Sequence, residues 1–81
     1  MRDAEEIVLR HLEIITGTDE VRKNLDIDLF GEHVLDSFGS VELIIALSES
    51  LGIELSPGQV DRQTWSTPRG IIADIEARLR G

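Results

Sequence analysis

The sequence predicts an all-α fold, a small four-helix bundle of three main helices and one short helix. Its 81 residues are enough for one hydrophobic core. Hydrophobic residues make up 41% of the chain and are mostly aliphatic, since the only aromatic residues are Phe30, Phe38 and Trp65. They recur at helical spacing in separate segments. We therefore expect residues 1–81 to form a single domain.

The first helix is expected to begin after Asp3, because aspartate is a good helix N-cap. Apolar and half-apolar residues then follow on one face at helical spacing. Gly17 marks the end of this helix, since glycine readily adopts the left-handed conformation just past a helix C-terminus. The residues of the apolar face are Ala4, Val8, His11, Leu12 and Ile15.

Residues 18–36 show no sustained period and are expected to form a long ordered loop between the first two main helices. Long loops in compact domains are rare unless they are fixed to the core. A short helical turn over residues 19–23 is compatible with the composition. No second strand exists to pair with the alternating segment 27–29. The apolar residues expected to insert into the core are Val21, Leu25, Ile27, Leu29, Phe30, Val34 and Leu35.

The second main helix is predicted from Ser37 to Leu51, closed by Gly52. Its core face consists of Leu43, Ile44, Leu47 and Leu51. On the opposite face, Ser37, Val41 and Ile45 follow one another at four-residue spacing, beside Glu42, Ser48 and Glu49. Two aliphatic side chains next to a hydroxyl and rimmed by acids indicate a docking surface. The alternative is that this helix is buried on most sides.

Two further helix starts are predicted from proline at the first helical position. Ser56 and Pro57 precede a very short helix, with Val60 and Trp65 as its apolar anchors. Pro68 begins the last helix. Its core face is expected to consist of Ile71, Ile72, Ile75 and Leu79, with Arg78 and Arg80 complementing the dipole in the last turn.

Composition excludes several classes of function. Without cysteine there is no disulfide, no thiolate nucleophile and no cysteine-based zinc site. The two histidines, His11 and His33, do not suffice for a metal site. A net charge of −8 disfavours binding to nucleic acid or to anionic membranes. No apolar run approaches the roughly 20 residues that span a bilayer, so a cytoplasmic protein is expected. We also expect it to be a monomer.

Three roles for Ser37 are open from the residues alone. Asp36 or Ser37 would serve as an ordinary N-cap of the second main helix. A catalytic serine needs a base, for which His33 is the nearby candidate, but the chain lacks a G-x-S-x-G elbow. Covalent modification by another enzyme needs an exposed hydroxyl at a helix N-terminus that favours phosphate, and a surface for the modifying enzyme to bind.

The stretch "LDSFGSVELIIALSESLGIEL" resembles the phosphopantetheine attachment region of acyl and peptidyl carrier proteins. Their hallmark is Asp-Ser before a large apolar residue at the start of the second helix, here Asp36-Ser37-Phe38. The resemblance covers nearly the whole chain. The segments "DIDLF" and "DRQTWSTP", at residues 26–30 and 61–68, are similar to the D-alanyl carrier proteins of teichoic acid modification.

The resemblance implies that Ser37 receives 4′-phosphopantetheine from coenzyme A and that the arm's thiol holds an aminoacyl or acyl group as a thioester. The chain would be no enzyme itself. Its partners would be a phosphopantetheinyl transferase, an adenylating amino acid ligase and a downstream acyl- or aminoacyltransferase. The resemblance places Asp36, Phe38, Val41, Glu42, Ile45 and Glu49 on the surface that meets these enzymes.

Gly39 and Ser48 replace positions that are acidic in typical fatty-acid carriers, which favours a more apolar contact with a dedicated partner. The cargo is expected to be an amino acid, for cell-wall D-alanylation or for polyketide or nonribosomal peptide synthesis. Seven arginines to one lysine indicate a G+C-rich genome, where discrete carriers often serve natural-product assembly. The alternatives are an ordinary acyl carrier of fatty acid synthesis, a non-catalytic helical interaction domain and a small serine hydrolase.

Overall fold

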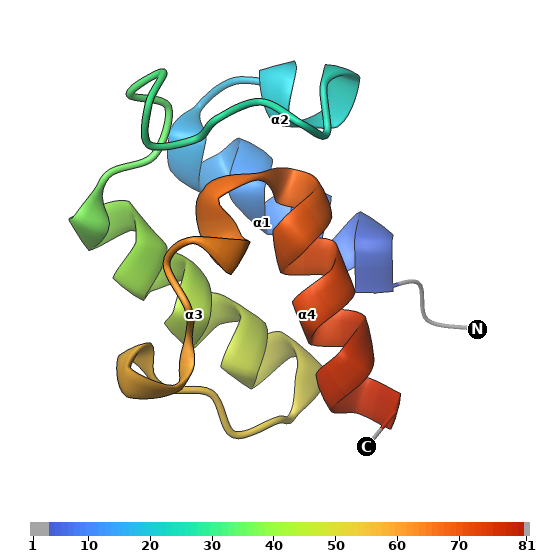
Figure 1. The fold of residues 1–81 in the computed structure, drawn as a ribbon. Helices are drawn as coiled ribbons and strands as arrows, with labels where there is room; N and C mark the ends of the chain where they lie inside the picture. Colours follow the sequence, from blue (N-terminus) through green and yellow to red (C-terminus); the bar gives the residue numbers. More distant parts are fainter. Residues whose placement is uncertain (1–3, 81) are drawn as a thin grey trace.

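The computed structural model describes residues 4–80, and within them every regular element is helical, as predicted. The three main helices are α1 (Ala4–Thr16), α3 (Ser37–Leu51) and α4 (Pro68–Arg80) (Figure 1). A short helix, α2 (Glu20–Lys23), lies in the connection between α1 and α3. Two 3-10 turns, η1 (Pro57–Gln59) and η2 (Thr64–Ser66), lead into α4. Asp3, the expected cap of α1, lies outside the described residues.

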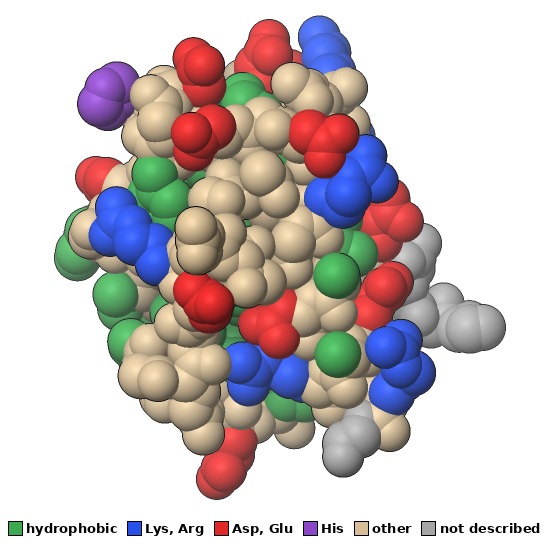
Figure 2. Space-filling model, in the orientation of Figure 1, with side chains coloured by type: hydrophobic (Ala, Val, Ile, Leu, Met, Phe, Trp, Pro, Cys, Tyr) green, Lys and Arg blue, Asp and Glu red, His purple; other side chains and the backbone are tan. Residues whose placement is uncertain are grey.

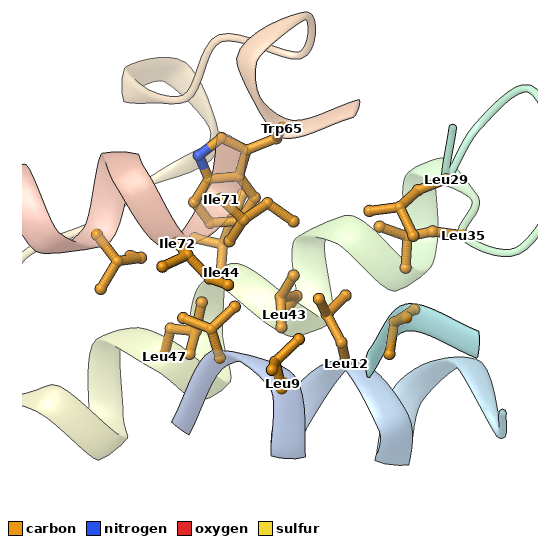
Figure 3. Packing of buried hydrophobic residues seen from close by; sticks show 13 residues of the cluster. Leu9, Leu12, Leu29, Leu35, Leu43, Ile44, Leu47, Trp65, Ile71 and Ile72 are labelled. Atoms are coloured by element: carbon orange, nitrogen blue, oxygen red, sulfur yellow. The ribbon is translucent and has the colours of Figure 1, made fainter. Parts of the chain in front are cut away.

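One hydrophobic core holds these elements together. α1 packs against both α3 and α4, and α4 packs against η2. In Figure 3, Trp65 lies on one side of the core and Leu9 and Leu12 of α1 on the other, with Leu43 and Ile44 of α3 between them. The predicted core face of α3 is confirmed, with Leu51 half-buried. On α1, the predicted face is buried or half-buried, but the prediction missed Leu9, which is also in the core. The buried apolar residues are Val8, Leu9, Leu12, Val21, Leu29, Leu35, Leu43, Ile44, Leu47, Trp65, Ile71, Ile72 and Ile75.

The prediction that Leu79 belongs to the core face of α4 is wrong. Ile71, Ile72 and Ile75 are buried, but Leu79 is 43% exposed. Its spacing continues the apolar stripe into the last turn of the helix. Burial also needs a neighbouring element to pack against, and at this end of the bundle the surroundings cover little more than half of the side chain.

The long connection is fixed to the core, as its apolar residues predict. Val21, Leu29 and Leu35 are buried, and the other predicted anchors are half-buried against the core. The Leu29 amide donates to the Ser66 carbonyl at 2.7 Å, and the Arg69 amide donates to the Leu25 carbonyl at 2.9 Å. These bonds fix the loop before α3 against the segment before α4, two regions far apart in the sequence.

The ends of the helices follow the predicted glycine signals. Gly17 and Gly52 have φ of +74° and +66°, the left-handed conformation that favours glycine. The short helix predicted after Ser56 is present as η1, whereas the second turn, η2, was not predicted. η2 buries Trp65, whose indole Nε1 donates to Asp74 Oδ2 on α4 at 2.7 Å.

Candidate functional site

The start of α3 is capped by Asp36 and not by Ser37. Asp36 has an extended backbone, and its Oδ1 accepts a hydrogen bond from the Gly39 amide at 2.6 Å. The Asp36 carbonyl accepts the Ser40 amide at 2.9 Å, which begins the helical pattern. Ser37 is the first residue of the helix. Its hydroxyl is therefore not used by the cap and is exposed to solvent.

The side chain that contacts this hydroxyl is Arg62, from the segment between η1 and η2. Arg62 Nη1 donates to Ser37 Oγ at 3.2 Å. The guanidinium lies over the Phe30 ring, with its carbon 4.1 Å from the ring centroid, a cation–π contact. Three segments far apart in the sequence thus meet at Ser37: the long connection, α3 and the η1–η2 segment.

This arrangement does not support the hydrolase alternative. Within residues 4–80, Arg62 is the only side chain in hydrogen-bond contact with Ser37 Oγ. A guanidinium is a permanent donor and cannot accept the serine proton as a general base. The candidate base, His33, has an exposed side chain and shows no hydrogen bond to Ser37. Nothing in the described residues therefore activates Ser37 as a nucleophile within the protein itself.

The exposed face of α3 beside Ser37 is apolar with an acidic rim. Phe38 is 74% exposed, Val41 38% and Ile45 53%. Figure 2 shows apolar side chains grouped along the left edge of the molecule, where α3 lies in Figure 1. The expected exposure of these side chains is confirmed, and the alternative of a helix buried on most sides is wrong. We call the following exposed residues the α3 surface: the capping residue Asp36 and, on the helix, Ser37, Phe38, Val41, Glu42, Ile45 and Glu49.

Gly39 and Ser48 do not belong to this surface. Gly39 is buried, and a Cβ there would lie 3.0 Å from Leu35 Cδ1 and 3.3 Å from Ile15 Cγ2. Ser48 is half-buried and its hydroxyl donates to the Ile53 carbonyl at 2.6 Å. Packing at Gly39 and a helix-end hydrogen bond at Ser48 therefore explain why neither residue is acidic. The interpretation that they make the docking face more apolar is not supported.

Two cavities flank the start of α3. One, of about 260 Å³, is lined on the helix by Phe38, Gly39 and Glu42, together with Asp36. The other, of about 110 Å³, lies between α3 and the η1–η2 segment and includes Arg62. Among the residues that the structure describes, no cluster of histidine and acidic side chains could hold a metal ion. None of the described helices has the length and apolar character to cross a membrane.

Sequence reasoning missed Arg62. It lies 25 residues after Ser37, and no periodic pattern connects two positions so distant. The segment 61–68, which contains Arg62, is similar to D-alanyl carrier proteins and could have pointed to this residue. The resemblance did not assign a role to its arginine. The cation that contacts Ser37 is thus supplied by tertiary packing.

Comparisons with known proteins show the family of the chain. Residues 6–75 match the family model of the phosphopantetheine attachment site. The D-alanyl carrier protein of Enterococcus faecalis is 48% identical over 73 residues, which cover 90% of this chain and 94% of the relative. That of Listeria monocytogenes is 47% identical over 72 residues, covering 89% and 92%. The D-alanyl carrier protein 1 of Lactiplantibacillus plantarum is 43% identical over 76 residues, covering 94% of each chain. The chain therefore belongs to the phosphopantetheine attachment family, whose domain is a non-catalytic carrier of a covalently bound 4′-phosphopantetheine.

Proposed function

We propose that this chain is a discrete, single-domain carrier that holds D-alanine as a thioester on a 4′-phosphopantetheine arm at Ser37, for the D-alanylation of a cell-wall polymer. The observation that carries the proposal is the position of Ser37. Its hydroxyl is exposed at the first residue of α3 and is not used by the helix cap. The similarity to D-alanyl carrier proteins supports D-alanine as the cargo.

The residues around Ser37 fit a phosphodiester. Asp36 supplies the cap, so the Ser37 hydroxyl is available without loss of helix stability. In the attachment step, Ser37 Oγ bonds to the phosphorus that carries pantetheine in coenzyme A. The bond between that phosphorus and the oxygen that bridges the two phosphates breaks, adenosine 3′,5′-bisphosphate leaves, and the hydroxyl proton passes to a base of the transferase. The first-turn amides of a helix favour the added negative charge.

The arm supplies a thiol, a group that the chain itself lacks. When bound, it provides the terminal thiol that carries the aminoacyl group, whereas the chain itself contains no cysteine. An exposed root on a helix leaves the arm free to reach the active sites of several enzymes in turn. The protein's contribution is therefore presentation and recognition.

The α3 surface is the proposed contact for the phosphopantetheinyl transferase, the adenylating ligase and the downstream transferase. Each partner must bring its active site to an arm rooted at Ser37, so its contact covers the first turns of α3. Val41 and Ile45 follow Ser37 at successive four-residue steps and would provide apolar anchors. Glu42 and Glu49 at the rim would steer a basic partner and make its association rate depend on salt.

The cargo is tested by incubating the holo-protein with ATP, a D-alanine-adenylating ligase and either D- or L-alanine. We expect intact mass spectrometry to show one alanyl group, formed faster from D-alanine and released by hydroxylamine, as a thioester requires. A holo-protein that never accepts D-alanine would contradict the D-alanyl assignment. The Ser37→Ala variant is the control, since it offers no site for the arm.

One observation favours a second candidate, an aminoacyl carrier for polyketide or nonribosomal peptide synthesis. The chain has seven arginines and a single lysine, a composition typical of G+C-rich genomes. The same loading assay with a panel of amino acids distinguishes the two candidates. Preferential loading of another amino acid by its own ligase would favour natural-product assembly over cell-wall modification.

A further inference from the structure

We propose that Arg62 is the anchor of the arm's phosphodiester: its guanidinium binds the phosphate attached to Ser37 and fixes the direction in which the arm leaves the protein. The inference rests on the proposed modification of Ser37. It assigns a role to the arginine of the segment 61–68, which the carrier function alone leaves unexplained.

The geometry that carries the proposal is already present in the unmodified protein. Arg62 Nη1 lies 3.2 Å from Ser37 Oγ, the atom that would bear the phosphorus. The non-bridging oxygens of a phosphodiester lie only two covalent bonds from that atom. They would thus come within reach of a guanidinium that needs no large movement. Arginine presents several N–H donors in one plane, which suits phosphate oxygens and gives charge-assisted hydrogen bonds.

Arg62 is held in place by groups that do not neutralise it. Its guanidinium lies over the Phe30 ring at 4.1 Å, and stacking on an aromatic face leaves the edge N–H groups free to donate. The neighbouring Asp61 accepts the Gln63 amide at 2.9 Å through its Oδ1 and forms no ion pair with Arg62 among the described residues. The position of Arg62 is therefore set by the fold, while its charge stays available for an anion.

Most other cations of the chain are already paired. Among the lysine and arginine side chains of residues 4–80, only those of Arg62 and Arg80 have no carboxylate oxygen within 4.0 Å. Of these two, Arg62 is the one in contact with Ser37. The cations with carboxylate partners are Arg10, Arg22, Lys23, Arg69 and Arg78.

The charge around Ser37 explains why such an anchor is useful. The chain has a net charge of −8, and Asp36 immediately precedes the modified residue. A phosphodiester adds a further negative charge to this surface and would be repelled by it. Arg62 offsets that repulsion and draws the root of the arm toward the η1–η2 segment, away from Asp36.

The test compares the response to modification in the wild type and in Arg62→Gln. Apo- and holo-forms of each are prepared with a phosphopantetheinyl transferase and coenzyme A, their masses are verified, and their melting temperatures are measured. We expect modification to raise the melting temperature of the wild type by a few °C more than that of Arg62→Gln, the size of effect of one exposed ion pair. This difference should shrink at about 1 M salt. Any effect of the substitution on the unmodified fold cancels in the comparison.

Matched controls separate the anchor from a general charge effect. Arg80→Gln removes the same charge from another unpaired arginine, and its response to modification should equal that of the wild type. Arg62→Lys keeps the charge but not the planar donors, so it should recover only part of the response. In the wild type, nuclear magnetic resonance should show the Arg62 Nε–Hε signal shifting on modification. The phosphorus signal should differ between the wild type and Arg62→Gln.

Failure of the anchor proposal can be distinguished from failure of the carrier proposal. If Ser37 never gains the arm, the carrier proposal fails and this inference with it. If the mass shows the arm in place, the carrier proposal stands and only the anchor is at issue. Equal responses to modification in the wild type and Arg62→Gln, with an unmoved Arg62 signal, would then overturn the anchor.

Discussion

Replacing Asp36 by alanine removes the cap of α3 without altering Ser37. The bond lost is the one from the Gly39 amide to Asp36 Oδ1, 2.6 Å long. Losing a helix N-cap costs about 1 kcal/mol, within a range of roughly 0.5–2. In a domain of this size, each kcal/mol lowers the melting temperature by about 4–8 °C. We therefore expect Asp36→Ala to melt about 4–8 °C below the wild type, measured by circular dichroism.

The Asp36→Asn variant separates the capping hydrogen bond of Asp36 from the effect of its negative charge. Asparagine caps a helix about as well as aspartate but carries no charge. The asparagine variant should melt close to the wild type, yet accept the arm more slowly, because it lacks the negative charge that Asp36 contributes to the proposed contact with the transferase. The second assay is the rate at which each variant gains the arm from coenzyme A.

Two results would refute this reasoning. A melting temperature of Asp36→Ala equal to that of the wild type would mean that the cap contributes nothing to stability. An Asp36→Asn variant that is modified at the wild-type rate would restrict Asp36 to its structural role and remove it from the proposed contact with the transferase.

Three further predictions concern the core, the α3 surface and pH. Leu47 is fully buried, so Leu47→Ala should destabilise the protein by roughly 2–5 kcal/mol in chemical denaturation. Val41→Asp or Ile45→Asp should leave the circular dichroism spectrum unchanged but strongly slow loading of the holo-protein by its ligase. Arg22 donates hydrogen bonds to Glu6 at 2.8 and 3.1 Å and holds the pKa of Glu6 below its ordinary value of 4.5. This pair should stabilise the fold above pH 4.5, and its contribution should be lost as the pH falls through the lowered pKa.

Each of these predictions has its own control or contrary result. An unchanged stability of Leu47→Ala would mean that the core face of α3 is assigned wrongly. Leu79→Asp introduces the same charge at a similarly exposed aliphatic residue of α4 and should load at the wild-type rate. If Val41→Asp and Ile45→Asp also load normally, the ligase binds elsewhere. In Glu6→Gln, the melting temperature should fall less steeply with decreasing pH in the acid range than in the wild type. An equally steep fall in both proteins would exclude a contribution from the Glu6–Arg22 pair.

The main helices could be predicted from the sequence because their signals are local. The bounds of α3, from Ser37 to Leu51 with Gly52 after it, follow from a capping residue, a helical period and a glycine. The exposure of Val41 and Ile45 follows from the same period. The helical period tells which face a residue lies on, but not whether another element covers that face at the end of the helix. For this reason the prediction for Leu79 was wrong.

The environment of Ser37 could be predicted only in part. Its position at a helix start is local, whereas its contact with Arg62 depends on how the η1–η2 segment packs against α3. The choice between Asp36 and Ser37 as the cap was open because both residue types cap well. The burial of Gly39 likewise depends on Ile15, a residue of another helix.

The central claim is that Ser37 is where the arm is attached. The most direct measurement is the intact mass of the protein after incubation with coenzyme A, magnesium and a broad-specificity phosphopantetheinyl transferase. We predict the mass increase of one phosphopantetheine in the wild type, located at Ser37 by peptide mapping, and none in Ser37→Ala. A wild type that never gains the arm, or a Ser37→Ala variant that still does, would contradict the account.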